Sequence, residues 1–371
     1  MAFKIFLDNI IYSIQKYGGV ATYWNGIQKY FLELDNVYII TQSEDQSIFD
    51  STGNEYSIKL QKDKFIFENL LPASIIRFLP LTKRLAAGSL YHASYYRTCP
   101  QKDVVNIYTV HDFTHKKGYS SKFPRRLVHI TLTSLCVRNA DGIICISEST
   151  KKDLIHYFPQ IPENKIRVIY HGVSEKFFPI EKAATYDMEE PLKLDGPFVI
   201  FIGKRQGYKK FDIIPRAIKQ TDTIKLVIIG GGDLSFSEAE NLKNTIPGRY
   251  TKMGNVSDHD LNILYNKAFA LIYPSISEGF GFPIAEAMRA GCPVITTNLS
   301  SIPEVGGSAS LMIAEVSSKA IAEKINLLKD DDIRAAVIEA GFRQSSKFSW
   351  KKCFSETLKF YEDIYKQKFK D

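Results

Sequence analysis

Two glutamates, Glu278 and Glu286, bracket the glycine-rich segment GFGFPIA within residues 277–297. Pro283 suits the first position of a helix and Gly291 suits the left-handed position after its end, so a short helix is predicted between them. One carboxylate then lies in the loop before the helix and the other about one turn inside it. The loop glycines allow close backbone approach, and the helix amino terminus offers N–H groups to an anion or to sugar hydroxyls. Both carboxylates can therefore face one polar ligand, a more specific pattern than a surface glutamate beside a glycine-rich loop.

Cations follow the predicted strand FVIFIG at residues 198–203. Arg205 and, four residues later, Lys209 stand in the turn and the first helical turn, where two cations can converge on a diphosphate. Lys210 is the alternative to Lys209. Taken alone, a loop with two or three basic residues is commonly solvated surface, so this segment gains weight from the glutamate pair.

Glycine and histidine residues follow two other predicted strands. Gly18 and Gly19 come after the first strand and before a predicted helix, where their amides can point at an anion. His111 and Asp112 come directly after the strand VVNIYTV. Such a histidine can be a base, a hydrogen-bond donor to a sugar, or part of an internally bonded loop. His115 fits none of these patterns.

The elements that must position these residues alternate along the whole chain. Val- and Ile-rich predicted strands alternate with amphipathic stretches, which indicates parallel sheets covered by helices on both faces. The pattern restarts after a Pro- and charge-rich stretch, so we predict an α/β protein of two doubly wound domains. The predicted division is a first domain at 1–176, a linker at 177–197, a second domain at 198–347, and a carboxyl-terminal helix at 348–371 that returns to the first domain.

Composition excludes several classes of protein. The chain has 371 residues, 44% of them hydrophobic and 24% charged, which fits two or three globular domains rather than a disordered protein. No apolar run approaches the ~18 residues of a membrane span, and the amino-terminal segment does not resemble a signal peptide. The five cysteines are scattered and lack a C-x-x-C pair, so we expect no disulfide framework, no metal site and a cytoplasmic location.

The positive charge is concentrated in the first half of the chain. Residues 59–126 carry 13 Lys and Arg against 4 Asp and Glu, a local charge of +9 within a total of +7. Apolar residues are interleaved there, so this stretch can attract an anionic lipid surface, a phosphorylated substrate or nucleic acid. A solvated basic face without a partner is the alternative.

The chain resembles the family 4 nucleotide-sugar glycosyltransferases. The ordered series that carries the resemblance runs through YGGVATYW (17–24), TVHDFTH (109–115), ADGIICISESTKKDL (140–154), KIRVIYHGVSEKFFP (165–179), FIGKRQGYKKFD (201–212) and the block at 277–305. It implies the GT-B fold, in which two Rossmann-like domains face each other across a cleft. His171 departs from the family's usual Asn at this position, and we interpret it as part of a hinge.

The resemblance also implies roles for site residues. Glu286 would bind the nucleotide ribose, Glu278 would lie at the donor sugar, and the backbone at Phe280, Gly281 and Phe282 would contact sugar hydroxyls. Arg205 and Lys209 would neutralise the donor diphosphate, and the loop at Gly18 and Gly19 would lie across the phosphates. His111 would be a functional residue. No cofactor and no catalytic metal would be needed.

We therefore predict a retaining glycosyltransferase that moves a hexose from a GDP- or UDP-linked donor to a glycan or lipid-linked acceptor in cell-surface polysaccharide synthesis. A nucleotide-sugar epimerase of the same fold and a non-catalytic nucleotide-sugar-binding subunit are the alternatives. With this function, the charge at 59–126 is better explained by peripheral contact with an anionic membrane on its inner face than by nucleic acid.

Overall fold

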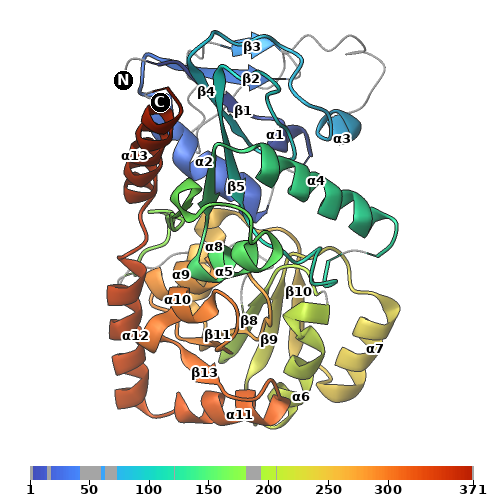
Figure 1. Cartoon of the computed structure of the whole chain (residues 1–371). Helices are drawn as coiled ribbons and strands as arrows, with labels where there is room; N and C mark the ends of the chain where they lie inside the picture. Colours follow the sequence, from blue (N-terminus) through green and yellow to red (C-terminus); the bar gives the residue numbers. More distant parts are fainter. Residues whose placement is uncertain are drawn as a thin grey trace. The chain divides into compact units, whose positions relative to one another are not determined.

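The computed structural model describes residues 3–14, 18–41, 60–62, 73–120, 122–180, 194–205 and 207–369. The chain forms two compact units, each built around one parallel sheet (Figure 1). Unit 1 is Met1–Gly172 together with Ser349–Asp371, and unit 2 is Val173–Phe348. The predicted fold class, two Rossmann-like α/β domains, is confirmed.

Unit 1 contains a seven-stranded sheet in the order β3-β2-β1-β4-β5-β6-β7, with every neighbouring pair parallel. Its strands are β1 (Ile5–Asp8), β2 (Val37–Thr41), β3 (Leu60–Lys62), β4 (Ser89–Ala93), β5 (Val104–Val110), β6 (Gly142–Cys145) and β7 (Ile166–Val168). Its helices are α1 (Ile11–Ile14), α2 (Gly19–Phe31), α3 (Ala73–Ile76), α4 (Arg125–Asn139), α5 (Glu148–Tyr157) and α13 (Trp350–Phe369). All residues of β4 and β5 are buried, which explains their nearly continuous apolar sequences.

Unit 2 contains a six-stranded sheet in the order β10-β9-β8-β11-β12-β13, also parallel throughout. Its strands are β8 (Phe198–Ile202), β9 (Lys225–Ile229), β10 (Tyr250–Met253), β11 (Ala270–Tyr273), β12 (Val294–Thr297) and β13 (Leu311–Ile313). Its helices are α6 (Ile214–Lys219), α7 (Phe236–Thr245), α8 (Asp258–Lys267), α9 (Phe282–Arg289), α10 (Ile302–Gly306), α11 (Ser318–Leu327) and α12 (Asp331–Ser345). In both units the strand order reverses at the middle of the sheet, where ligands of such folds bind.

The last helix, α13, packs against α2 in unit 1, and the two helices run side by side in Figure 1. Gly26 of α2 makes this possible, because a Cβ at that position would lie 2.1 Å from the Trp350 ring. Phe31 and Tyr361 stack further along the same contact, with ring centroids 5.5 Å apart. The carboxyl-terminal segment is thus part of the core of unit 1.

The division between the units differs from the predicted linker. The chain leaves unit 1 at Gly172, and Val173 donates a backbone hydrogen bond to Phe348 within unit 2. Residues 177–180 pack on α8. The backbone N–H groups of Phe178 and Ile180 donate hydrogen bonds to the side-chain oxygens of Asn262 and Asn266. Residues 181–193 of the predicted linker lie outside the described residues. Within the described residues, no helix combines the length and apolar character needed to cross a membrane.

Candidate active site

The site residues of unit 2 follow β8 and β11, the neighbouring strands at which the sheet order reverses. The turn after β8 contains Lys209, and the loop after β11 contains Glu278. A backbone hydrogen bond of 2.9 Å from Ile276 to Tyr208 ties the loop to the turn. The topology therefore brings two segments nearly 70 residues apart to one sheet edge, counting from Lys209 to Glu278 in the sequence.

Lys209 and Glu278 form a direct ion pair. The Lys209 Nζ lies 2.7 Å from Oε1 of Glu278, and the two side chains are only 12% and 13% exposed. The same ammonium donates to the Tyr273 hydroxyl at 2.6 Å. Tyr273 is the last residue of β11, and burial together with Glu278 holds its pKa well above the ordinary value. A cation, a carboxylate and a phenol thus meet beyond the strand ends.

Two serines after β12 hold the loop that contains Glu278. Ser300 accepts from the Glu278 N–H at 3.2 Å and its hydroxyl lies 2.7 Å from the Glu278 carbonyl. Ser301 donates to the same carbonyl at 2.9 Å and lies 3.2 Å from the carbonyl of Phe280. The Phe280 side chain is buried. Ser300 has a left-handed backbone, φ 56°, and this conformation places its hydroxyl at the loop.

Helix α9 begins at Phe282, immediately after Gly281 and one residue before the predicted start at Pro283. Gly281 is its N-cap with φ 100°, a conformation that favours glycine. Phe282 is the first helical residue and Pro283 follows it in the first turn, while Gly291 has φ 82° beyond the end. The first turn of α9 therefore directs N–H groups outward beside the loop that contains Glu278.

Glu286 lies one turn into α9 and faces Tyr265 of α8. The Tyr265 hydroxyl is 3.5 Å from Oε2 of Glu286. Burial, and secondarily the charge of Asp258, raise the pKa of Glu286 to about 8, while Tyr265 opposes the shift. Tyr265 is also close enough to Tyr273 for its charge to raise the pKa of Tyr273. Each of the two glutamates thus has a buried tyrosine beside it.

Arg205 and Lys209 bind different carboxylates, and the convergence of the two cations on a diphosphate stays a prediction. The Arg205 Nε lies 2.8 Å from Oε1 of Glu238, and the arginine side chain is only 4% exposed. Its remaining nitrogens donate to the carbonyls of Gly230, Gly232 and Asp233. Burial alone would raise the pKa of Glu238, but hydrogen bonds from Ser235 and Arg205 lower it. The neighbouring Lys204 is the exposed cation of this turn.

The glycine-rich loop after β9 is shaped around Arg205. Gly230, Gly231 and Gly232 all have positive φ, between 69° and 74°. A Cβ on Gly231 would lie 2.4 Å from the Gly203 carbonyl oxygen and 2.8 Å from the guanidinium of Arg205. Lys210, the alternative phosphate ligand, has a left-handed backbone with φ 51° before the turn at 211–213. Of the predicted cations, Lys209 is the one that meets a predicted carboxylate.

Unit 1 positions the other predicted residues. Gly18 is the N-cap of α2, with φ 138°, and Gly19 is its first residue, so the amides of the first turn of a 13-residue helix are presented there. His111 follows β5 and lies edge-on to Tyr23, with ring centroids 5.3 Å apart. Burial lowers the pKa of His111 to about 4, although Asp112 opposes the shift. The His111 imidazole is therefore neutral at physiological pH.

A buried cluster surrounds His111. His171, which we interpreted as a hinge residue, is buried 4.7 Å from the Tyr23 ring, and burial followed by His111 lowers its pKa well below the ordinary value. His92 bonds Thr109 at 2.8 Å through Nε2 and the Tyr361 hydroxyl through Nδ1. This chain of contacts connects α13 to the end of β5.

Sequence reasoning missed Tyr273, Tyr265, Ser300, Ser301 and Glu238. The tyrosines lie in apolar runs and were indistinguishable from core residues. The two serines could have been found from the sequence, since they follow a predicted strand just as Glu278 does. Among the described residues, no group of three or more His, Cys, Asp or Glu is arranged to hold a metal ion.

Two family profiles match the chain in sequence order. The profile described as Glycosyltransferase Family 4 matches residues 17–177, and that described as Glycosyl transferases group 1 matches residues 183–344. The chain belongs to glycosyltransferase family 4. This family 4 glycosyltransferase is 27% identical to the O-antigen chain mannosyltransferase B of Escherichia coli, over 70% of its own length and 68% of the relative. It is 29% identical to the O-antigen chain mannosyltransferase RfbU of Salmonella typhimurium, over 55% of each chain.

Solved structures share its fold. Sucrose-phosphate synthase from Thermosynechococcus elongatus superposes with a TM-score of 0.74 at 19% identity, over 98% of this glycosyltransferase and 99% of that chain. Anabaena HepE in complex with UDP-glucose gives a TM-score of 0.71 at 15% identity, over 97% and 99%. These likenesses confirm the expected GT-B fold.

Proposed function

We propose that this family 4 glycosyltransferase transfers a hexose of the mannose or glucose type from a nucleotide diphosphate to a hydroxyl of a glycan or lipid-linked acceptor, with retention. The mannosyltransferase names of its relatives favour cell-surface polysaccharide synthesis, and the UDP-glucose bound to HepE favours a nucleotide-sugar donor. GDP-mannose and a UDP-hexose are the donors to test. The observation that carries the proposal is the paired Lys209 and Glu278 at the switch point of unit 2.

In the proposed reaction, the bond between the anomeric carbon and the phosphate oxygen breaks. The acceptor oxygen bonds to the same face of the sugar, and its proton passes to the leaving phosphate. Lys209 stabilises the charge that develops on the diphosphate, and Glu278 accepts hydrogen bonds from sugar hydroxyls beside the oxocarbenium-like transition state. We propose that these residues suffice without a cofactor or a catalytic metal.

The remaining site residues bind and orient the donor. Glu286, with its pKa raised to about 8, is mostly protonated at neutral pH and offers the ribose one O–H donor as well as an acceptor. Gly18 and Gly19 present amides to the phosphates, and neutral His111 hydrogen-bonds a sugar hydroxyl. Arg205, which is ion-paired with Glu238, fixes the glycine-rich loop, a positioning role that we propose in addition to its predicted contact with the diphosphate.

The proposal is tested with purified wild-type protein and two variants, Glu278→Gln and Lys209→Met. A thermal-shift screen of nucleotides and then of nucleotide sugars identifies the donor, and transfer is measured with a panel of glycan and lipid-linked acceptors. Both variants are expected to lose transfer while remaining folded, whereas Glu323→Gln, in an exposed Lys–Glu pair of α11, keeps full activity. Full activity in either site variant would contradict the proposal.

The same assay separates the alternative functions. Incubation with donor alone yields a new nucleotide sugar if the protein is an epimerase, and leaves the sugar unchanged if it is a transferase. Tight nucleotide binding without turnover on any acceptor would indicate a non-catalytic subunit. An inverted anomeric product in the NMR spectrum would contradict retention alone and leave the donor site intact.

A further inference from the structure

Helix α4 and the turn before it expose an apolar row in unit 1. Phe123 is 82% exposed, and Leu127, Val128 and Leu135 on α4 are also exposed. Leu127 and Leu135 are eight residues apart, which places them on one side of the helix, and Phe123, in the turn before α4, lines the same pocket as Leu127. We call these four residues the α4 face. Exposed apolar side chains that gather on one face mark an interaction surface, whereas isolated ones need no explanation.

The opposite side of α4 fixes the helix in place. His129, Thr133, Cys136 and Val137 are buried against unit 1. His129 stacks on His115 with ring centroids 3.9 Å apart and an interplanar angle of 10°. This stacking gives His115, which fitted no sequence motif, a structural role. The exposed row is therefore displayed by a firmly packed helix.

The surroundings of the α4 face are entirely basic in sequence. Residues 113–140 contain six Lys and Arg and no Asp or Glu. Lys122 and Arg125 are exposed beside the amino-terminal end of the row, and Arg138 is exposed near its other end. An apolar row with exposed cations near both of its ends is complementary to a surface that is anionic above and apolar beneath.

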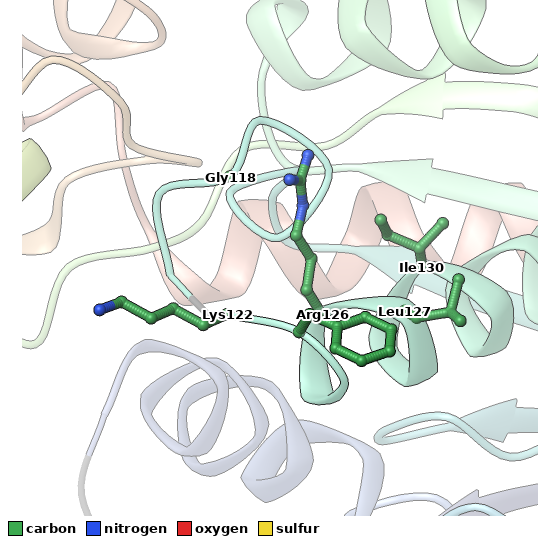
Figure 2. A pocket seen from close by; sticks show the side chains of 6 residues that line it. Gly118, Lys122, Arg126, Leu127 and Ile130 are labelled. Carbon is green, nitrogen blue, oxygen red and sulfur yellow. The ribbon is translucent and has the colours of Figure 1, made fainter.

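A pocket of about 460 Å³ opens at the amino-terminal end of this row, lined by Gly118, Lys122, Phe123, Arg126, Leu127 and Ile130 (Figure 2). Arg126 extends toward the turn at Gly118, where it donates to the carbonyls of His115 and Lys116 at 3.0 and 2.8 Å. Lys122 projects away from Leu127 and Ile130. The pocket thus combines apolar walls with a cation at its edge.

We propose that the α4 face binds the surface of an anionic lipid bilayer, with Phe123 and Leu127 inserted at the boundary between headgroups and acyl chains. Lys122 and Arg125 bind lipid phosphates. This places the contact on the exposed residues between 122 and 138, which only partly overlap the basic stretch 59–126. Of the apolar residues interleaved in that stretch, Phe65, Phe67, Leu70 and Leu71 lie outside the described residues, Ile76 is buried and Ile75 is exposed. The proposal goes beyond the transfer reaction, because vesicle binding requires neither donor nor acceptor.

The full-length protein is sedimented with vesicles of phosphatidylcholine and with vesicles in which phosphatidylglycerol replaces part of it. Binding is expected on the anionic vesicles and is expected to fall as salt rises. Lys122→Gln with Arg125→Gln removes two cations and should weaken binding about thirtyfold at low salt. Phe123→Ser with Leu127→Ser should weaken it by at least about tenfold.

Matched controls come from unit 2. Phe236 is 84% exposed on α7, and Lys319 is exposed on α11, so Phe236→Ser and Lys319→Gln should bind vesicles as the wild type does. Circular dichroism checks that each variant is folded. If the variant with Phe123→Ser and Leu127→Ser does not fold, the variant with Leu127→Ser and Leu135→Ser takes its place in the binding assay.

Equal binding to neutral and anionic vesicles would overturn the proposal. So would unchanged binding in the apolar double variant. A concentration-dependent dimer that this variant abolishes would instead assign the α4 face to a second copy of the chain. Donor binding by all of these variants is measured separately, so failure of the membrane contact is distinguished from failure of the proposed transfer.

Discussion

The ion pair between Lys209 and Glu278 should contribute far more to the free energy of unfolding than an ion pair on the surface does. With Nζ and Oε1 2.7 Å apart, the direct attraction is about 6 kcal/mol at an effective dielectric constant of about 20. Desolvation of both groups offsets part of this, and loss of one partner leaves the other as a poorly compensated buried charge. We expect Lys209→Met to lower the free energy of unfolding by about 3 kcal/mol. Glu278→Gln should lower it by about 2 kcal/mol, because Lys209 keeps its bond to Tyr273.

The double variant should be destabilised by about 2 kcal/mol rather than by the sum of the single losses, a coupling of about 3 kcal/mol. Urea unfolding of all four proteins measures it, provided that the m values agree. The exposed pair Lys319–Glu323 is the matched control, with an expected coupling of about 0.5 kcal/mol or less. The double variant should remain inactive in transfer despite its recovered stability. A coupling below about 1 kcal/mol would refute the interpretation of Lys209 and Glu278 as a buried functional pair.

Two further predictions concern unit 2. Because the pKa of Glu286 is raised to about 8, the folded protein keeps a proton that the unfolded chain releases, and stability falls as pH rises between the two pKa values. Relative to Glu286→Gln, the wild type should lose roughly 1.4 kcal/mol per pH unit from about pH 5.5 to about pH 7.5, and a pH-independent difference in urea unfolding would contradict this. Gly231→Ala should be destabilising by about 3 kcal/mol, since its Cβ would lie 2.4 Å from the Gly203 carbonyl oxygen. Gly232→Ala, with the same φ of 74° and open space around the Cβ, should show only the backbone strain of about 1 kcal/mol; equal losses in the two variants would contradict the steric argument.

Local patterns predicted the elements that are long, buried or well bounded. The strand VVNIYTV was recognisable because every residue of β5 is buried, and α9 because Pro283 and Gly291 mark its ends. The short strand β10, with the sequence YTKM, lacks this signal. It forms because the neighbouring β9 pairs with it, a non-local interaction that overrides weak local preference.

The sequence predicts which residues of the candidate site follow a strand and so lie at the same edge of the sheet. It does not predict where a side chain points when a partner far away in the sequence determines its direction. Glu278 and Lys209 both follow strands that the topology makes neighbours. Arg205 follows the same strand as Lys209, but its guanidinium is directed by Glu238, which lies 33 residues further along the chain. The spacing of Arg205 and Lys209 in the sequence does not indicate that Glu238 is the partner of Arg205.

Two acidic residues each bind one of the four cations in the turn after β8. Glu238 and the carbonyls of the 230–233 loop bind Arg205, while Glu278 and Tyr273 bind Lys209. Arg205 has four hydrogen bonds that hold it in place, so displacing it would disrupt the glycine-rich loop as well. Lys209 has a flexible, unbranched side chain with one ammonium, and it can turn from Glu278 to another anion without breaking the fold. Because of this physical difference between the two environments, we propose a structural role for the arginine and expect the lysine to be the cation that reorients toward a ligand.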